Sequence, residues 1–243
     1  MTAIGEAVLS TLLLEGTKLR LAEPHIYTVL SDTEVASTYD TQFGYIYDLV
    51  ACNPIYNRVI WGYSVSMFAS IAHDALRSSN EGNVLDLGCG SLAFTAKEYT
   101  QYSERPVVLL DQSLKMLRIA KSRLIRINRV VPDNMVFLHA NALQLPFHKE
   151  SFKTVIAENL LHCLDDTKSL LKGLINVLSG NGKIYFTTLV EGNRLADRYL
   201  RALANGGKLV YRSIDDHRET FDQLGISVRW DVDGNMASFF YGD

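Results

Sequence analysis

Residues 84–90 read Val-Leu-Asp-Leu-Gly-Cys-Gly, an apolar run that leads directly into a glycine turn. A short run rich in valine and leucine is typical of a strand buried in a sheet, and glycines allow a tight turn into a helix. In an open α/β sheet, ligands lie beyond the carboxyl ends of the strands, where the next helix presents free N–H groups. The stretch therefore predicts one strand of such a sheet, with a ligand-binding turn at its end.

Short apolar runs alternate with amphipathic segments on the C-terminal side of this stretch. We expect strands at 84–87, 107–110, 135–138, 154–157 and 183–189, and helices at about 93–101, 114–128, 167–178 and 193–204. This alternation indicates βαβ crossovers and a parallel sheet. Residues 225–231 and 236–241 are separated only by the turn Asp233-Gly234-Asn235, which predicts an antiparallel hairpin. The expected fold class is α/β, a doubly wound, mainly parallel seven-stranded sheet with a C-terminal antiparallel hairpin.

The residues that precede the glycine turn have a different pattern. Aromatic and aliphatic side chains recur at three- and four-residue spacing over 35–50 and 60–76, with Pro54 between them. We therefore expect a helical N-terminal cap at residues 1–80, within the same domain as a core at residues 81–243.

Composition restricts the class of protein. The chain has 243 residues, of which 47% are hydrophobic and 21% charged, so it suits one domain with a large core and excludes a disordered chain. Its 24 basic and 27 acidic residues give a net charge of −3, which argues against nucleic acid as a partner. The pattern does not indicate an oligomeric state.

Three cysteines, an odd number, indicate reduced thiols and a cytoplasmic location. No apolar stretch approaches the roughly 18 residues that a membrane helix requires, so we expect no membrane contact. The six histidines and three cysteines show no metal-ligand spacing, so no metal is expected.

Two acidic residues indicate a nucleoside cofactor. Asp86 precedes the first glycine, and Asp111 ends the next expected strand, where its carboxylate can accept hydrogen bonds from both ribose hydroxyls. The residues from Gly88 to Ala93 match the dinucleotide fingerprint G-x-G-x-x-A, so an NAD(P)-dependent oxidoreductase is one interpretation. Asp86 argues against it, because it puts negative charge where a pyrophosphate is expected and suits a ligand ammonium group instead.

Four motifs in order resemble those of the class I S-adenosylmethionine-dependent methyltransferases, in particular the small-molecule branch that includes quinone-biosynthesis enzymes. They are VLDLGCG (84–90), LLDQSLKMLRIA (109–120), HANALQLPFHKESFKTVIAENLLHCLDD (139–166) and LSGNGKIYFTT (178–188). The resemblance covers roughly residues 35–241. It implies methyl transfer from S-adenosylmethionine to an oxygen, nitrogen or carbon of a small molecule, with S-adenosylhomocysteine as the product.

The resemblance also implies cofactor-binding roles for a set of residues around the strand ends. They are Tyr39, Asp86, Gly88, Cys89, Gly90, Asp111, Gln112, Met116, Asn141, Ala142 and Glu158. In this family pattern Asp86 and the glycines hold the methionine end, Asp111 binds the ribose hydroxyls and Glu158 faces the sulfonium. Met116 packs on the adenine, and Tyr39 closes over the methionine carboxylate.

The sequence departs from the family pattern at one residue of this set, Asn141, and at Leu92, which lies next to the set in the glycine loop. Leu92 stands where glycine is usual and makes the loop bulkier near the methionine moiety. Asn141, which with Ala142 contacts the adenine edge, stands where aspartate is common and brings no charge; it could also be only a turn residue. Because of Leu92, and because no residue is an assured base, a protein that binds S-adenosylmethionine without methylating anything, or that uses it for other chemistry, is a further alternative.

Catalytic and acceptor-binding candidates come from the cap and from the loops that follow the strands. His162 is the candidate base, if the acceptor must lose a proton; packing against the next helix is its other interpretation. Tyr45, Tyr47 and Trp61 are candidates for a wall over the acceptor or for ordinary core packing. Arg212 is a candidate substrate contact or a surface residue.

Overall fold

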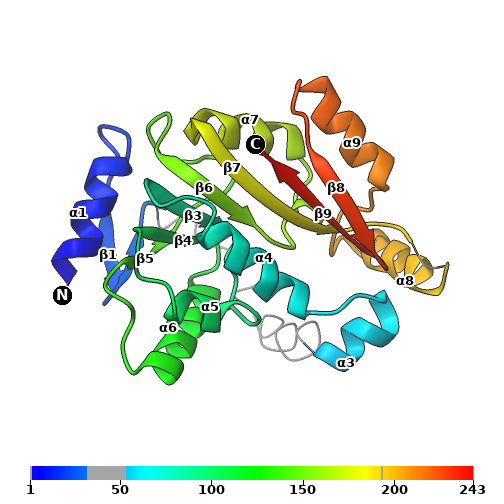
Figure 1. Cartoon of the computed structure of the whole chain (residues 1–243), viewed down its shortest axis with the longest axis horizontal. Coiled ribbons are helices and arrows are strands. Elements are labelled where there is room, and N and C mark those ends of the chain that lie inside the picture. The colour runs from blue at the N-terminus through cyan, green and yellow to red at the C-terminus, as the bar shows by residue number, and fades with distance from the viewer. Residues whose placement is uncertain (1, 32–52, 193, 243) are drawn as a thin grey trace.

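The computed structural model describes residues 2–31, 53–192 and 194–242. The cap helix expected at 35–50 and the candidates Tyr39, Tyr45 and Tyr47 lie outside the described residues. The described residues form one mixed sheet with helices on both faces (Figure 1).

The sheet contains nine strands among the described residues, in the order β1-β2-β5-β4-β3-β6-β7-β9-β8. Their bounds are β1 Arg20–Glu23, β2 Ile26–Thr28, β3 Asn83–Leu87, β4 Val107–Asp111, β5 Met135–His139, β6 Phe152–Ala157, β7 Leu178–Leu189, β8 Arg229–Asp233 and β9 Met236–Tyr241. Strands β2 to β7 run parallel, whereas β9 is antiparallel to both β7 and β8. This confirms the α/β fold class, the mainly parallel sheet and the C-terminal hairpin.

The N-terminal region differs from the expected helical cap, because it adds two strands to the seven that the sequence predicts. Helix α1 (Thr2–Leu12) is followed by the hairpin of β1 and β2, whose turn contains Pro24 and His25. Ile26 and Tyr27 then pair in parallel with Phe137 and Leu138 of β5. The edge of β5 has unpaired backbone groups that β2 satisfies, so even a three-residue strand is stable there.

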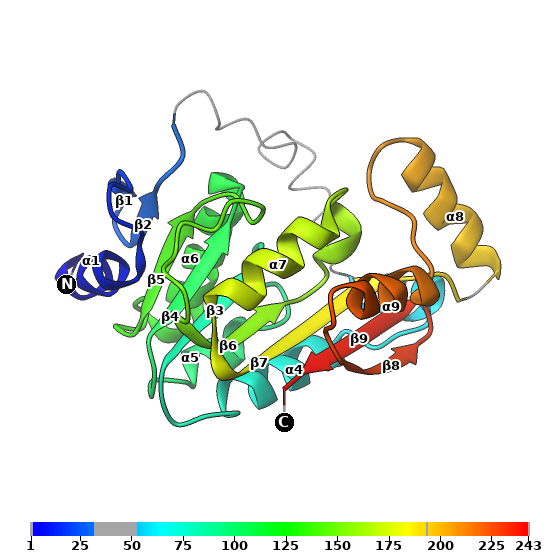
Figure 2. The same ribbon diagram turned by 90° about the horizontal axis from the view of Figure 1, so that it is seen from above.

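Helices cover the two faces of the sheet in separate layers (Figure 2). On one face α1, α7 (Thr167–Val177) and α9 (Ile214–Gln223) belong to the same apolar cluster as Leu85 and Leu87 of β3. On the other face α4 (Ser66–Leu76), α5 (Ala96–Thr100) and α6 (Leu114–Asn128) pack on Val84 and its neighbours. Alternate residues of β3 thus enter opposite cores, as the pleat of a strand requires, and Asp86 is on the face of α5.

A third apolar cluster lies at the carboxyl end of β7. The short helix α3 (Pro54–Tyr56) and the π-helical turn η2 (Asn57–Trp61) pack there against helix α8 (Arg194–Asn205). Figure 2 shows α8 beyond the end of the sheet. Among the described residues, no helix is both long and apolar enough to cross a lipid bilayer.

Candidate functional site

The strand order reverses between β3 and β6, because β4 and β5 follow on one side of β3, whereas β6 and β7 lie on the other. Ligands of open α/β sheets bind at such a switch point, outside the carboxyl ends of the strands. Three acidic residues meet at this edge. Asp86 is the penultimate residue of β3, Asp111 ends β4, and Glu158 directly follows β6.

The glycine turn after β3 is joined to β4 by its backbone. The amides of Gly88 and Cys89 donate to the carbonyl of Leu110 at 2.8 and 3.0 Å. Gly88 has φ +70°, and a Cβ there would lie 2.8 Å from Cδ1 of Leu160, so only glycine fits without a shift. This turn places bare backbone at the switch point between β3 and β6.

Asp111 holds the turn from the other side. Its Oδ2 accepts from the amide of Gly90 and its Oδ1 from the amide of Ser113, both at 2.8 Å. A carboxylate has several lone pairs and can accept hydrogen bonds from two hydroxyl groups at once. The carboxylate is therefore fixed in place and fits the two hydroxyls of a ribose.

Asp86 is buried, with 5% of its surface exposed, and its Oδ2 accepts from the hydroxyl of Tyr99 at 2.6 Å. Burial raises the pKa of Asp86 to about 7; the Tyr99 hydrogen bond opposes this shift, and the charge of Asp111 adds to it. The carboxyl group is thus close to its ionisation midpoint at neutral pH and suits a cationic ligand group such as an ammonium.

Glu158 carries a buried oxygen, Oε1, that has no hydrogen-bond partner within the described part of the chain. Burial and the nearby charge of Asp86 hold the pKa of Glu158 well above its ordinary value. Buried polar atoms are normally satisfied, so an unpartnered acceptor directly after β6 fits a ligand that supplies positive charge or a donor.

The other predicted cofactor residues lie around the same edge. Burial raises the pKa of the Cys89 thiol well above its ordinary value, which keeps the thiol neutral and unsuited to act as a nucleophile. Met116 is buried in the first turn of α6, and the side chain of Gln112 is exposed. Asn141 lies after β5, where its Oδ1 accepts from the amide of Leu143 at 2.9 Å. Asn141 therefore stabilises the turn after β5, as its alternative interpretation expects. The same oxygen keeps a lone pair that can accept a hydrogen bond from a ligand.

Leu92 explains why the helix after the turn starts later than expected. Its φ is +53°, a left-handed conformation, and α5 begins only at Ala96. The Leu92 side chain is 2% exposed and packs in the same apolar cluster as Ala96 and Tyr99. Side-chain burial therefore compensates for the strained backbone at the position where the family pattern has glycine.

This balance predicts an inverted order of stability for two Leu92 variants. Both Leu92→Ala and Leu92→Gly lose the buried side chain, which costs about 2–5 kcal/mol. Only alanine keeps the left-handed strain of about 1–2 kcal/mol. We expect Leu92→Gly to be about 1 kcal/mol more stable than Leu92→Ala in urea unfolding. Equal stability, or a more stable alanine variant, would show that the backbone at residue 92 is not left-handed.

His162 lies in the short 3₁₀ turn η3 (Leu161–Cys163) and is 3% exposed. Its Nδ1 accepts from the amide of Leu189 at 3.3 Å and lies 3.1 Å from the hydroxyl of Thr188. Burial lowers the pKa of His162 to about 3, and the charges of His217 and Arg212 add to this shift. A neutral imidazole that already accepts from β7 is a weak base. These contacts support a structural role for His162, although its partners are residues of β7 and not of the next helix.

Arg212 and Trp61 are brought into contact with other segments of the chain. Arg212 donates to the carbonyls of Leu161 and Asp165, at 3.2 and 2.7 Å. Trp61 is buried, and its ring packs on Tyr199 of α8 with the centroids 5.5 Å apart. Both residues therefore fasten segments that surround the carboxyl edge of the sheet.

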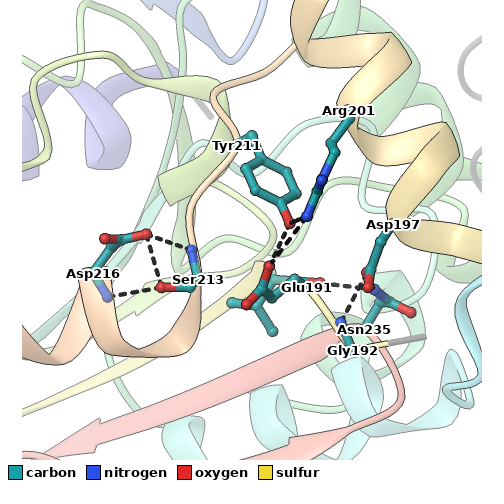
Figure 3. Close-up of polar contacts among 9 residues, drawn as sticks. Glu191, Gly192, Asp197, Arg201, Tyr211, Ser213, Asp216 and Asn235 are labelled. Atoms are coloured by element: carbon teal, nitrogen blue, oxygen red, sulfur yellow. Dashed lines mark hydrogen bonds and ion pairs between the residues drawn. The ribbon is translucent and has the colours of Figure 1, made fainter. Parts of the chain in front are cut away.

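A polar network joins α8 to the segments that flank it, as Figure 3 shows. Tyr211 donates to the carboxylate of Glu191, and Arg201 of α8 donates to the Tyr211 hydroxyl at 3.2 Å. The side chain of Asn235 donates to Asp197 of α8 at 2.9 Å and to the carbonyl of Val190 at 2.8 Å.

The backbone amide of Asn235 also donates to the carbonyl of Trp61, at 2.8 Å. The turn between β8 and β9 thus holds η2, α8 and the end of β7 together. This junction and Tyr99 are the features of the site that the sequence did not indicate. A tyrosine nine residues after Gly90 has no recognisable pattern, and Asn235 resembles an ordinary turn residue.

Comparison with known proteins agrees with this geometry. A family model described as "Methyltransferase domain" matches residues 78–225, more than half of the chain. A demethylmenaquinone methyltransferase of Lactococcus lactis is 36% identical over 104 residues, which are 42% of this chain and 40% of the relative. A ubiquinone/menaquinone biosynthesis C-methyltransferase of Marinomonas is 27% identical over 171 residues, which are 68% of this chain and 65% of the relative. Both matches span less than two thirds of the relative's length.

Among solved structures, magnesium protoporphyrin IX methyltransferase from Synechocystis, crystallised with bound S-adenosylhomocysteine, has a similar fold. The TM-score is 0.63 at 15% identity, over 87% of this chain and 99% of that chain. The solved structure shows the same fold, and the family model confirms the predicted family: the chain belongs to the methyltransferase domain family.

Proposed function

We propose that this protein transfers a methyl group from S-adenosylmethionine to a small, flat and largely apolar acceptor. The observation that carries the proposal is the set of three carboxyl groups, on Asp86, Asp111 and Glu158, around a glycine turn at the switch point of the sheet. Two of them suit the positive charge of the methionine end, and the third suits the ribose.

In this proposal, Asp111 holds the ribose hydroxyls and Asp86 holds the ammonium group, beside the backbone of Gly88 and Gly90. Met116, Asn141 and Ala142 lie on the side expected for the adenine. The bound cofactor supplies a methyl group on a positively charged sulfur. The protein's remaining tasks are therefore to align the acceptor and to exclude water.

The acceptor side of the site is rich in aromatic rings. Phe94 lies four residues after Gly90 and stacks on Phe68, with ring centroids 5.2 Å apart. Phe68 in turn contacts the edge of Tyr63, and Trp61 belongs to the same cluster. Trp61, Tyr63 and Phe68 are buried, so Phe94 is the partly exposed ring of these four that could contact a planar acceptor. The names of the two curated relatives make a demethylated quinol the first compound to test.

His162 has a positioning role in this proposal rather than the role of a base. Its neutral ring joins η3 to β7 and so fixes the loop that follows Glu158. Trp61 and Arg212 position the acceptor-side segments in the same way. That the protein does not bind nucleic acid and that it is cytoplasmic stay predictions.

The test combines binding and turnover. A ligand at 100 times its Kd stabilises a protein by about 2.7 kcal/mol, which for this chain length is a rise in Tm of about 5–10 °C. We expect that rise with S-adenosylmethionine and with S-adenosylhomocysteine but not with NADH. We also expect S-adenosylhomocysteine to form when a demethylated quinol is added. Binding without turnover across a panel of acceptors would favour a protein that does not methylate, and a shift with NADH alone would favour an oxidoreductase.

The pKa of Asp86 makes cofactor affinity depend on pH. An ammonium group binds the ionised carboxylate, so below pH 7 the free protein must release a proton on binding. We expect the affinity for S-adenosylhomocysteine to rise about tenfold per pH unit up to about pH 7 and then to level off. Calorimetric titrations between pH 5 and 8 measure this profile.

Tyr99→Phe sharpens the same measurement. It removes the hydroxyl that stabilises ionised Asp86, so the midpoint of the profile should move to higher pH. Tyr27→Phe, on the opposite face of the sheet, should leave the midpoint unchanged. A wild-type profile that is flat over this range would mean that Asp86 does not bind the ammonium group.

A further inference from the structure

A cavity of about 830 Å³ lies at the end of the sheet where the parallel strands β6 and β7 begin. Its wall includes Ser78 after α4, Lys153 of β6, Lys183 of β7 and Arg229 of β8. The candidate cofactor site lies where β3, β4 and β6 end, so the two are at opposite ends of the sheet. Cavities of about 300–1,000 Å³ are typical of small-molecule sites. The volume therefore suits a ligand of its own, separate from the cofactor.

The register of the sheet brings Lys183 and Arg229 to the same wall of this cavity. Lys183 and Tyr185 are two residues apart in β7, so their side chains share a face of the sheet. Tyr185 pairs with Phe240 of β9, and Phe240 pairs with Arg229 of β8; side chains of directly paired residues also share a face. The guanidinium carbon of Arg229 lies 4.3 Å from the centroid of the Phe240 ring, which holds the charge against the sheet.

The described residues of the lining have an excess of positive charge. Lys153 donates to the side chain of Asn181 and lies 3.9 Å from the carboxylate of Glu81, which is 81% exposed, so this ion pair is weak. Lys183 and Arg229 have no carboxylate partner among the described residues. Three cationic side chains and one carboxylate thus line the cavity, a net charge of +2 in a chain whose net charge is −3.

A buried cation stands behind this wall. Arg105 is 2% exposed and, within the described part of the chain, donates only to neutral oxygens, among them the carbonyl of Glu81 and the hydroxyl of Thr154, both at 3.1 Å. The Thr154 hydroxyl in turn lies 3.1 Å from that of Ser78, which lines the cavity. Buried charges are normally paired with an opposite charge. The positive charge of Arg105 therefore adds to the attraction of this cavity for an anion.

We propose that the cavity binds a small molecule that carries a diphosphate group, with Lys183 and Arg229 as its charged contacts. Guanidinium and ammonium groups are the side chains that bind phosphate oxygens best. The cations come from β6, β7 and β8, and neighbouring strands are about 4.8 Å apart, so they are spread over more room than one phosphate group covers. An enclosed volume and a negative net charge favour a small ligand over nucleic acid.

The experiment is titration calorimetry of the whole chain with inorganic pyrophosphate and with inorganic phosphate. The buffer contains about 0.1 M NaCl, which screens charges more than about 10 Å apart. We expect pyrophosphate to bind at one site with a Kd below about 1 mM and phosphate to bind about tenfold more weakly. Saturating S-adenosylhomocysteine should leave the affinity for pyrophosphate unchanged, because the two sites lie at opposite ends of the sheet.

Lys183→Gln and Arg229→Gln test the two charged contacts. Each should weaken pyrophosphate binding about tenfold, and thermal unfolding checks that each variant is folded. Lys168→Gln is the matched control, because it removes the same charge from an exposed residue in the first turn of α7. The control should bind pyrophosphate like the wild type.

Gly180 offers a second test that removes no side chain. It lines the cavity, and no atom lies within 4 Å of the position that its Cβ would take. Gly180→Asp therefore adds a negative charge without crowding, and Gly180→Asn adds the same shape without the charge. We expect the aspartate variant to bind pyrophosphate at least about tenfold more weakly than the asparagine variant.

Three results would overturn the proposal. The first is a wild-type Kd above about 1 mM, or a Kd that both Lys183→Gln and Arg229→Gln leave within about threefold. The second is competition between pyrophosphate and S-adenosylhomocysteine, which would place the diphosphate in the cofactor site. The third is a short DNA duplex that binds more tightly than pyrophosphate and is weakened by the same variants. None of these results bears on methyl transfer, which S-adenosylhomocysteine binding and turnover test separately.

Discussion

Asp111→Asn should weaken the binding of S-adenosylhomocysteine about 100-fold. The carboxylate accepts from two backbone amides and, in the proposed function, from both ribose hydroxyls. Hydrogen bonds to a charged group contribute about 1.5–3 kcal/mol each, so loss of the charge removes about 3 kcal/mol of binding. Asparagine also turns an NH₂ group toward either Gly90 or Ser113, where a donor would face a donor.

Titration calorimetry measures this effect, and Asp133→Asn is the matched control, because Asp133 is exposed in the loop before β5. The control should bind like the wild type. An Asp111→Asn variant whose affinity stays within about threefold of the wild type would show that the ribose does not lie on β4.

Gly234→Ala should lower the free energy of unfolding by about 3 kcal/mol or more. Gly234 lies in the turn between β8 and β9 and has φ +59°. A Cβ there would overlap the carbonyl oxygen of Trp61 and lie 2.8 Å from the carbonyl carbon of Gly62. Both neighbours are backbone atoms, so neither can move aside as a side chain could.

Urea unfolding measures the loss, and Gly16→Ala separates its two causes. Gly16 also has a positive φ, of +81°, but no atom lies within 4 Å of the position that its Cβ would take. The control should therefore lose only about 1 kcal/mol, the cost of the left-handed backbone. If the two variants lose equal stability, the turn at Gly234 does not pack closely against the backbone of Trp61 and Gly62.

The junction at Asn235 gives the same substitution a functional consequence. Its side chain and backbone join the end of β7, α8 and η2, the segments that surround the proposed acceptor side. A variant that folds with a displaced turn should therefore lose acceptor affinity before it loses cofactor affinity, because Asp86 and Asp111 lie on other strands.

The elements of the fold that were predicted correctly are those whose own residues carry a recognisable sequence pattern. Strands such as β3 and β4 are continuous apolar runs, and the hairpin of β8 and β9 has a glycine-asparagine turn. Strands β1 and β2 were missed, since four and three residues carry little periodicity and their pairing depends on the free edge of β5. Their stability is a tertiary property.

The residues of the site likewise fall into those that a sequence pattern indicates and those that it does not. Asp86, Asp111 and the glycines follow from strand ends and a turn, which leave a pattern in the sequence. Tyr99 donates a hydrogen bond to Asp86, 13 positions away, and Asn235 donates one to Asp197, 38 positions away. These partners become evident only when the sheet brings them together. Burial of His162, which lowers its pKa to about 3, is equally invisible in the sequence.

A crystal structure with S-adenosylhomocysteine tests most directly whether a nucleoside cofactor lies on the carboxyl ends of β3, β4 and β6. We expect the ribose hydroxyls on Asp111 and the ammonium group at Asp86, beside the glycine turn. A nucleoside found elsewhere, for example in the groove at the opposite end of the sheet lined by Lys153, Lys183 and Arg229, would contradict this placement.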